Sequence, residues 1–166
     1  WRNPCDDLYH YGGIRFSADR KTGLVAGYWP VGTVKASFVE IWRNRQLHHA
    51  FEVSRSTPFV SHDNLISPSG ELWTHVNDVT VDLYSIRGNL VQRFESPTDI
   101  TDQVFSPDGK FLVIATRDAA IHIWHLENNN AVTCISSGRE WLMLADDGYF
   151  DASRLGGELL SIAHGA

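Results

Sequence analysis

Only two cysteines, Cys5 and Cys134, occur among the 166 residues. A disulfide-stapled scaffold uses more cysteines, and a zinc site needs clustered ligands. The pair therefore predicts free thiols in a reducing compartment, and we expect a cytoplasmic protein.

Basic residues are also scarce, with 14 Lys and Arg against 20 Asp and Glu and a net charge of −6. A nucleic-acid-binding surface normally carries a basic excess or a clustered basic stripe, and the densest basic stretch, residues 43–49, is short and interrupted. No apolar run reaches the roughly 18 residues that a membrane span requires. We expect neither nucleic-acid nor membrane partners.

The chain does contain a repeated pattern. The segment "VFSPDGKFLVIATRDAAIHIWHLE", residues 104–127, has an apolar pair, a Ser-Pro-Asp-Gly turn, an apolar strand, a break and a second strand that closes on Trp124. Residues 65–84 repeat this order and close on Tyr84. Residues 14–42 repeat it with a longer turn that ends at Gly23.

The closing aromatics define the period, which is 42 residues from Trp42 to Tyr84 and 40 residues from Tyr84 to Trp124. Units of about 40–45 residues with four short strands are typical of propeller blades. We predict an all-β protein, a β-propeller of four-stranded antiparallel blades that spans residues 1–166. The predicted units are a partial blade at 1–11, complete blades at about 12–53, 60–96 and 103–136, and a partial closing blade at 140–166.

Strands are predicted from apolar runs bounded by turn residues. In the first complete blade the second strand is 24–28, and an enlarged loop is expected over residues 30–37. The strands predicted for the other two blades are 71–77, 80–86 and 90–95 in one, and 103–106, 110–116, 120–126 and 131–136 in the other.

These units resemble WD40-repeat β-propellers over nearly the whole chain. The residues that carry the resemblance are the turns at 16–17, 67–70 and 106–109 and the closing Trp42, Tyr84 and Trp124. The Asp that usually follows the closing Trp in that family is replaced here by Arg43, Ser85 and His125, and the usual Gly-His pair is absent. The resemblance therefore implies degenerate repeats.

The C-terminal segment "EWLMLADDGYFDASRLGGELLSIAHG", residues 140–165, has a second resemblance. It is similar to the closing blade of bacterial multidomain proteins that join WD40 repeats to a caspase-like peptidase or another effector. This implies that the propeller is a sensing or docking module beside a catalytic domain.

Two arrangements fit the partial units at either end. They could pair and close a ring of four blades, or the chain could be a portion of a larger propeller. The chain begins on Trp1 in the middle of a unit, so we expect the second arrangement, in which further blades cover the apolar faces.

Motifs for catalysis and metal binding are weak. Residues 146–151 lack the alternating acids and distal Glu of a calcium loop. The adjacent His48 and His49 point to opposite faces of a strand, and the other histidines are scattered. Cys134 falls in a predicted outer strand, not in an electropositive site. We predict no metal, no cofactor and no catalytic residue.

The sequence predicts a non-catalytic protein-interaction or scaffold module, whose partners are proteins that include further blades or domains of the same assembly. Two alternatives stay open: a propeller enzyme with a central-channel site, for which the inner strands offer Arg15, Asn64 and Gln103, or a sensor domain attached to an effector. Binding is expected in loops and exposed turns. The predicted contact residues are Trp29, Val31, Lys35, Arg55, His62, Asp63, Asp78 and Arg117.

Overall fold

The predicted all-β class is confirmed by the computed structural model, which describes residues 10–31, 34–54 and 64–159. The strands of this part of the chain form three sheets in which every strand pair is antiparallel. The chain divides into two compact units, residues 1–95 and residues 96–166, and each is described by itself. No helix in the described part of the chain has the length and apolar character needed to cross a membrane.

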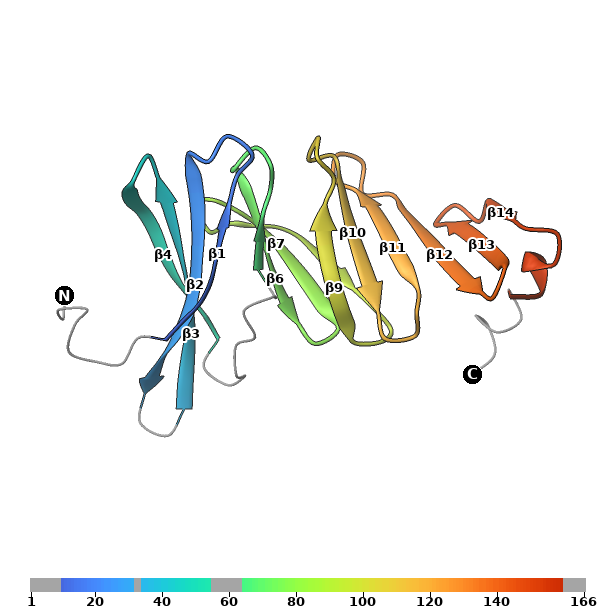
Figure 1. Cartoon of the computed structure of the whole chain (residues 1–166), viewed down its shortest axis with the longest axis horizontal. Coiled ribbons are helices and arrows are strands. Elements are labelled where there is room, and N and C mark those ends of the chain that lie inside the picture. Colours follow the sequence, from blue (N-terminus) through green and yellow to red (C-terminus); the bar gives the residue numbers. More distant parts are fainter. Residues whose placement is uncertain (1–9, 32–33, 55–63, 160–166) are drawn as a thin grey trace. The chain divides into compact units, whose positions relative to one another are not determined.

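The first unit contains two four-stranded sheets, each with its strands in chain order (Figure 1). The first sheet consists of β1 (His10–Phe16), β2 (Thr22–Val31), β3 (Val34–Arg43) and β4 (Gln46–Ser54). The second sheet consists of β5 (Asn64–Ile66), β6 (Leu72–Asn77), β7 (Thr80–Ser85) and β8 (Leu90–Glu95).

The second unit contains the third sheet, of six strands, and a short 3₁₀ helix. These elements are β9 (Ile100–Phe105), β10 (Phe111–Thr116), β11 (Ile121–His125), β12 (Ala131–Ser137), β13 (Glu140–Ala145), β14 (Phe150–Ala152) and η1 (Gly156–Leu159). β13 pairs with β12 from Val132↔Ala145 to Ser137↔Glu140, so residues 140–152 extend the third sheet. The sequence predicts a partial closing blade at 140–166, whereas its first two strands are paired with the third sheet.

Strand positions in the second sheet agree with the sequence prediction to within one residue at each end. The enlarged loop predicted over residues 30–37 is wrong. β2 and β3 stay paired as far as Val31↔Val34, and only residues 32–33 between them lie outside the described part. Val31 and Val34 are β-branched and favour extended backbone, so the hairpin is lengthened instead of opened into a loop.

One turn recurs in all three sheets and accounts for the repeat seen in the sequence. In the third sheet Ser106 N–H donates to Phe111 O at 2.9 Å, and Phe111 N–H donates to Ser106 Oγ at 2.9 Å. Asp108 accepts from the Ser106 hydroxyl and from Lys110 N–H, and these hydrogen bonds lower the pKa of Asp108. The serine therefore closes the turn while the Asp holds its centre.

The first sheet has the same turn, between Ser17 and Thr22. The longer turn predicted to end at Gly23 is wrong, because Arg20 occupies the position of the turn glycine and the turn closes at Thr22. Arg20 has a φ of 57°, against 74° for Gly70 and 72° for Gly109 at the same point of the other two turns. A left-handed φ is strained for a residue with a Cβ, so the first turn contains a local conformational cost.

We expect Arg20→Gly to stabilise the chain by about 0.5–1 kcal/mol, because glycine relieves the left-handed strain and the Arg20 side chain is exposed. Lys21→Gly is the matched control, since Lys21 is also exposed and has no left-handed φ. The control should destabilise by about 0.5–1 kcal/mol. Urea unfolding measures both, and equal effects of the two substitutions would contradict the argument.

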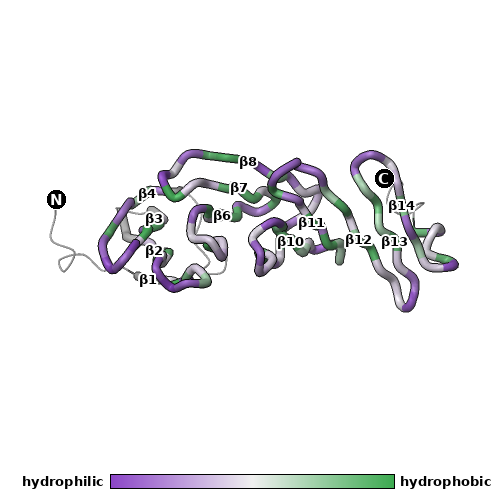
Figure 2. The backbone as a smooth tube through the Cα atoms, turned by 90° about the horizontal axis from the view of Figure 1, so that it is seen from above, coloured by the Kyte–Doolittle hydropathy of each residue, from purple (hydrophilic) through white to green (hydrophobic). Residues whose placement is uncertain are grey.

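The first and second sheets pack face to face around a shared core. It contains Leu24, Ala26, Val39 and Ile41 from the first sheet and Ile66, Trp73 and Ile86 from the second. Hydrophobic stretches lie along the strands, and hydrophilic stretches lie at most of the turns that join them (Figure 2). The apolar side chains of the strands are therefore available for the core between the sheets, and the polar turns remain in water.

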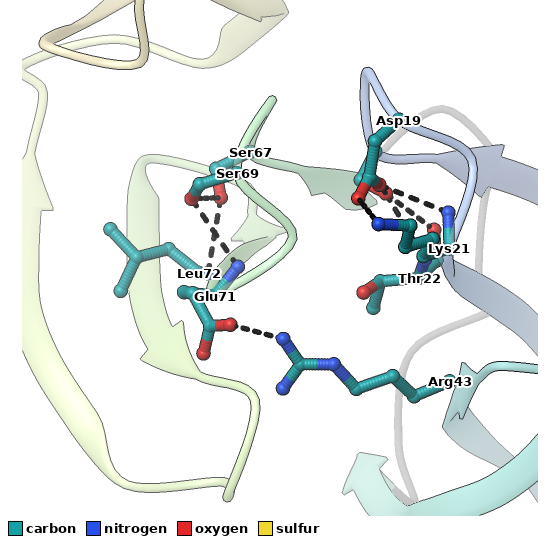
Figure 3. Close-up of polar contacts among 9 residues, drawn as sticks. Asp19, Lys21, Thr22, Arg43, Ser67, Ser69, Glu71 and Leu72 are labelled. Carbon is teal, nitrogen blue, oxygen red and sulfur yellow. Dashed lines mark hydrogen bonds and ion pairs between the residues drawn. The ribbon is translucent and has the colours of Figure 1, made fainter.

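The recurring turns of these two sheets also lie side by side (Figure 3). Ala18 N–H donates to Pro68 O at 2.9 Å, and Arg43 forms an ion pair with Glu71 at 2.5 Å. A Cβ on Gly70 would lie 2.7 Å from Thr22 Oγ1. Glycine at this position therefore serves both the left-handed φ and the close approach of the neighbouring sheet.

Candidate interaction site

The predicted contact residues occupy different kinds of position. Trp29 and Val31 lie on β2 and Lys35 lies on β3, so these three belong to one hairpin and not to a loop, since Pro30 pairs with Lys35. Only Asp78 and Arg117 lie in exposed turns within the described residues. The others, Arg55, His62 and Asp63, lie outside the described residues.

Asp78 and Arg117 are held at their turns by local geometry. Asp78 has a left-handed φ of 49° in the two-residue turn that joins β6 and β7. Arg117 forms an ion pair with Asp99 at 2.9 Å, and its N–H donates to the Asp99 carbonyl. Both side chains are exposed, and they belong to different units.

The first sheet has an apolar face that no described element covers. Paired positions on this face include Phe16↔Gly23, Gly23↔Trp42 and Trp42↔Leu47. The exposed side chains Ile14, Phe16, Trp42 and Leu47 define what we call the outer face of the first sheet. Trp42 donates its indole N–H to Glu40, its neighbour along the same face of β3. Large apolar side chains gathered on one sheet face are typical of a contact surface.

A second exposed apolar face lies on the third sheet. The ladder pairs Val104 with Val113 and Val113 with Ile123, and the alternate row pairs Ala115 with Ile121. Val104, Ile121 and Met143 are exposed on this face and Val113 and Ile123 are half-buried; together they define what we call the open face of the third sheet. Its other face is buried at Phe105, Leu112 and Ile114, so the two sides of this sheet differ sharply in exposure.

A small pocket lies in the first unit, between β4 and the second sheet. Its lining residues are Phe51, Glu52, Trp73, Tyr84 and Gly88, and its volume is about 120 Å³. Pockets for drug-sized ligands measure roughly 300–1,000 Å³, so this one has room for a single side chain at most. Sequence reasoning missed it because its residues come from separate segments, and only the turn at Gly88 carried a signal.

Stacked aromatic rings form the wall of this pocket. The ring centroids of Phe51 and Trp73 are 5.7 Å apart and those of Trp73 and Tyr84 are 4.6 Å apart. Trp73 also donates its indole N–H to Ser85 O at 2.9 Å. A Cβ on Gly88 would lie 2.1 Å from Phe51 Cε1, so any side chain there would have to displace the Phe51 ring.

A row of polar side chains crosses all four strands of the second sheet. Asn64, His75, Asp82 and Arg93 are successive ladder partners. His75 Nδ1 lies 3.1 Å from Asn64 Oδ1, and Arg93 contacts both oxygens of Asp82 at 2.6 and 2.8 Å. This row stabilises the second sheet through hydrogen bonds between neighbouring strands.

Burial sets the ionisation of His75, and the contact with Arg93 sets that of Asp82. Burial lowers the pKa of His75 to about 4, against a smaller opposing effect from Asp82. Burial alone would raise the pKa of Asp82, but the hydrogen bonds and charge of Arg93 outweigh it and lower that pKa. At neutral pH the row therefore contains an uncharged imidazole beside an ion pair.

Within residues 10–31, 34–54 and 64–159, no three His, Cys, Asp or Glu side chains come together so as to hold a metal ion. Cys134 is half-buried on β12, and burial raises the pKa of its thiol. The described residues thus offer packing surfaces, a small aromatic pocket and a partly buried polar row.

Comparison with known proteins bears on the fold. No protein-family model and no curated protein matches the chain. The chain is similar to a solved structure described as the crystal structure of the eukaryotic initiation factor, with 16% sequence identity and a TM-score of 0.56. The match covers 91% of this chain and 36% of that chain, so the present chain spans about a third of that protein. In all, 600 solved chains match, so the arrangement of sheets is widespread and does not by itself select a function.

Proposed function

We propose that the chain is a non-catalytic protein-interaction module of WD40-like β-propeller type, and a portion of a larger propeller or assembly. The observation that carries this proposal is the pair of exposed apolar sheet faces. The exposed Phe16 and Ile121 each occupy a position of the repeat that is buried in another sheet, at Ile66 and at Val39. Such faces need a covering partner.

The outer face of the first sheet corresponds to the face through which the second sheet packs on the first. Aligning the recurring turns places Phe16 at the position of Ile66, and aligning the ladders places Trp42 at the position of Tyr84. Phe16 is 61% exposed whereas Ile66 is 8% exposed. This position of the repeat is thus buried in the second sheet, which has a neighbouring sheet, and exposed in the first, where no covering sheet is described.

The open face of the third sheet corresponds to the other surface in this contact, which is the face of the first sheet that packs against the second sheet. Ile121 takes the position of Val39, and Val113 takes the position of Leu24. Val39 is fully buried beneath the second sheet, whereas Ile121 is 44% exposed. This supports a role in which the third sheet receives another sheet-like partner.

Two further observations support a portion of a propeller. The first and second sheets follow each other in chain order with the same turn and the same strand order. The initiation-factor structure that the chain resembles is much longer than the matched part. The exposed turns at Asp78 and Arg117 and the β2–β3 hairpin are proposed as the places where other proteins dock.

A photo-reactive amino acid at position 42 or 121, in the protein as cells produce it, tests this function. We expect crosslinks to protein at both positions, at a yield several-fold above that from position 110, where Lys110 is exposed and polar. Mass spectrometry identifies the crosslinked peptides. Yields at positions 42 and 121 no higher than at position 110 would refute the interaction role.

A further inference from the structure

We propose that two copies of this chain associate head to tail, the outer face of the first sheet in one copy packing on the open face of the third sheet in the next. This inference rests on the proposed function and names the occupant of both faces. It follows from the contact between the first and second sheets, which is formed by two different faces of the same repeat.

Each of the two faces that form this contact has an equivalent face elsewhere in the chain that no described element covers. One of these equivalent faces is the row in which Phe16 and Trp42 stand where Ile66 and Tyr84 stand in the second sheet. Gly23 takes the place of Trp73, and the Phe16 ring lies over it, with Cε1 3.2 Å from the position of a Gly23 Cβ. An aromatic surface is therefore kept at this position although the tryptophan is absent.

The other equivalent face is the one that would receive it. Val113, Ala115, Ile121 and Ile123 occupy the positions of Leu24, Ala26, Val39 and Ile41. Every one of these pairs is apolar in both sheets. Leu24, Ala26, Val39 and Ile41 all lie in the core formed with the second sheet. The open face of the third sheet thus offers the same kind of apolar surface as the face of the first sheet on which the second sheet packs.

The area sets the strength of the association. Strands lie about 4.8 Å apart and rise about 3.3 Å per residue, so four strands of six residues present roughly 400 Å² of flat sheet per side. Both sides together bury roughly 800 Å², which is below the 1,200–2,000 Å² that stable specific contacts bury in total and in the range of weak encounters. We therefore expect weak, concentration-dependent association with a Kd in about the micromolar range or above.

The symmetry of the contact distinguishes it from an ordinary dimer. Two different faces meet, so the contact is heterologous, and each added copy leaves one face of each kind free at the ends. The mean mass in solution should therefore rise gradually with concentration, unless the copies close into a ring. A symmetric dimer would bring like faces together and stop at two copies.

Sedimentation velocity on four forms of the chain tests the inference: wild type, Trp42→Glu, Ile121→Glu and the control Val91→Glu. Val91 is exposed on the edge strand β8 and belongs to neither face. Each face variant alone should raise the Kd at least about tenfold, whereas the control should associate like wild type. An equimolar mixture of the two face variants should restore a complex that stops at two copies, because each variant supplies the face that the other lacks.

Several results would overturn the inference. They are a wild-type chain that stays monomeric up to millimolar concentration, a face variant that still self-associates like wild type, or a mixture that fails to form the complex. Circular dichroism of each variant confirms that it is folded. Crosslinks from position 42 or 121 to a different protein, with a monomeric wild-type chain, would leave the proposed function standing and remove this inference alone.

Discussion

Trp73→Ala is expected to destabilise the first unit by about 3–5 kcal/mol, whereas Trp42→Ala should cost clearly less, about 1–2 kcal/mol. Trp73 is 2% exposed, lies between the rings of Phe51 and Tyr84, and donates its indole N–H to Ser85 O. Its removal loses burial, two stacking contacts and a hydrogen bond. Trp42 is 36% exposed on a sheet face that no described element covers, so its removal loses less buried area and opens a gap that water can enter.

Urea unfolding followed by far-ultraviolet circular dichroism measures both losses, with Trp73→Phe as an intermediate variant that retains one ring. The two tryptophans should rank in the opposite order in self-association or partner binding, where Trp42→Ala weakens the contact. A large stability loss from Trp42→Ala would mean that the outer face of the first sheet is covered within the chain itself.

The sequence predicted those elements whose signals are local. Strands 71–77, 80–86 and 90–95 were placed nearly correctly, because each is an apolar run between turn residues such as Gly70 and Gly88. The recurring serine turn was visible in two of its three copies for the same reason. In the third copy only the end of the turn is misplaced, at Gly23, because Arg20 takes a backbone conformation usually reserved for glycine.

Features that depend on contacts between distant segments were not predicted. The pocket combines Phe51, Trp73 and Tyr84, and nothing in the spacing of these residues indicates that β4 packs over β6 and β7. The continued β2–β3 pairing was hidden by Pro30 and Gly32, which normally indicate a loop. β13 was assigned to a new unit because its apolar run resembles a first strand, whereas its partner is set by the short turn at Gly138, whose φ is 65°.

Acidification should destabilise the first unit by roughly 3 kcal/mol between pH 6.5 and pH 4 through His75 alone. Burial lowers the pKa of His75 from its ordinary 6.5 to about 4 in the folded chain. The unfolded chain therefore binds a proton over this interval while the folded chain does not, and stability falls as the pH drops. Above pH 6.5 neither state is protonated, and the full stability is present. Below pH 4 both states are protonated, and the dependence on His75 ends.

His75→Gln should flatten this dependence, because the glutamine amide can still donate to Asn64 Oδ1 but cannot take up a proton. The free energy of unfolding of the variant should be close to that of wild type at pH 7.5 and higher than that of wild type at pH 4.5. Part of the dependence of the unfolding free energy on pH will remain because of His122, since burial also lowers the pKa of that residue. His48→Gln is the matched control because the His48 side chain is exposed, and it should keep the wild-type profile. If His75→Gln shows the same loss of stability on acidification as wild type, then His75 is not the group that the folded chain holds neutral.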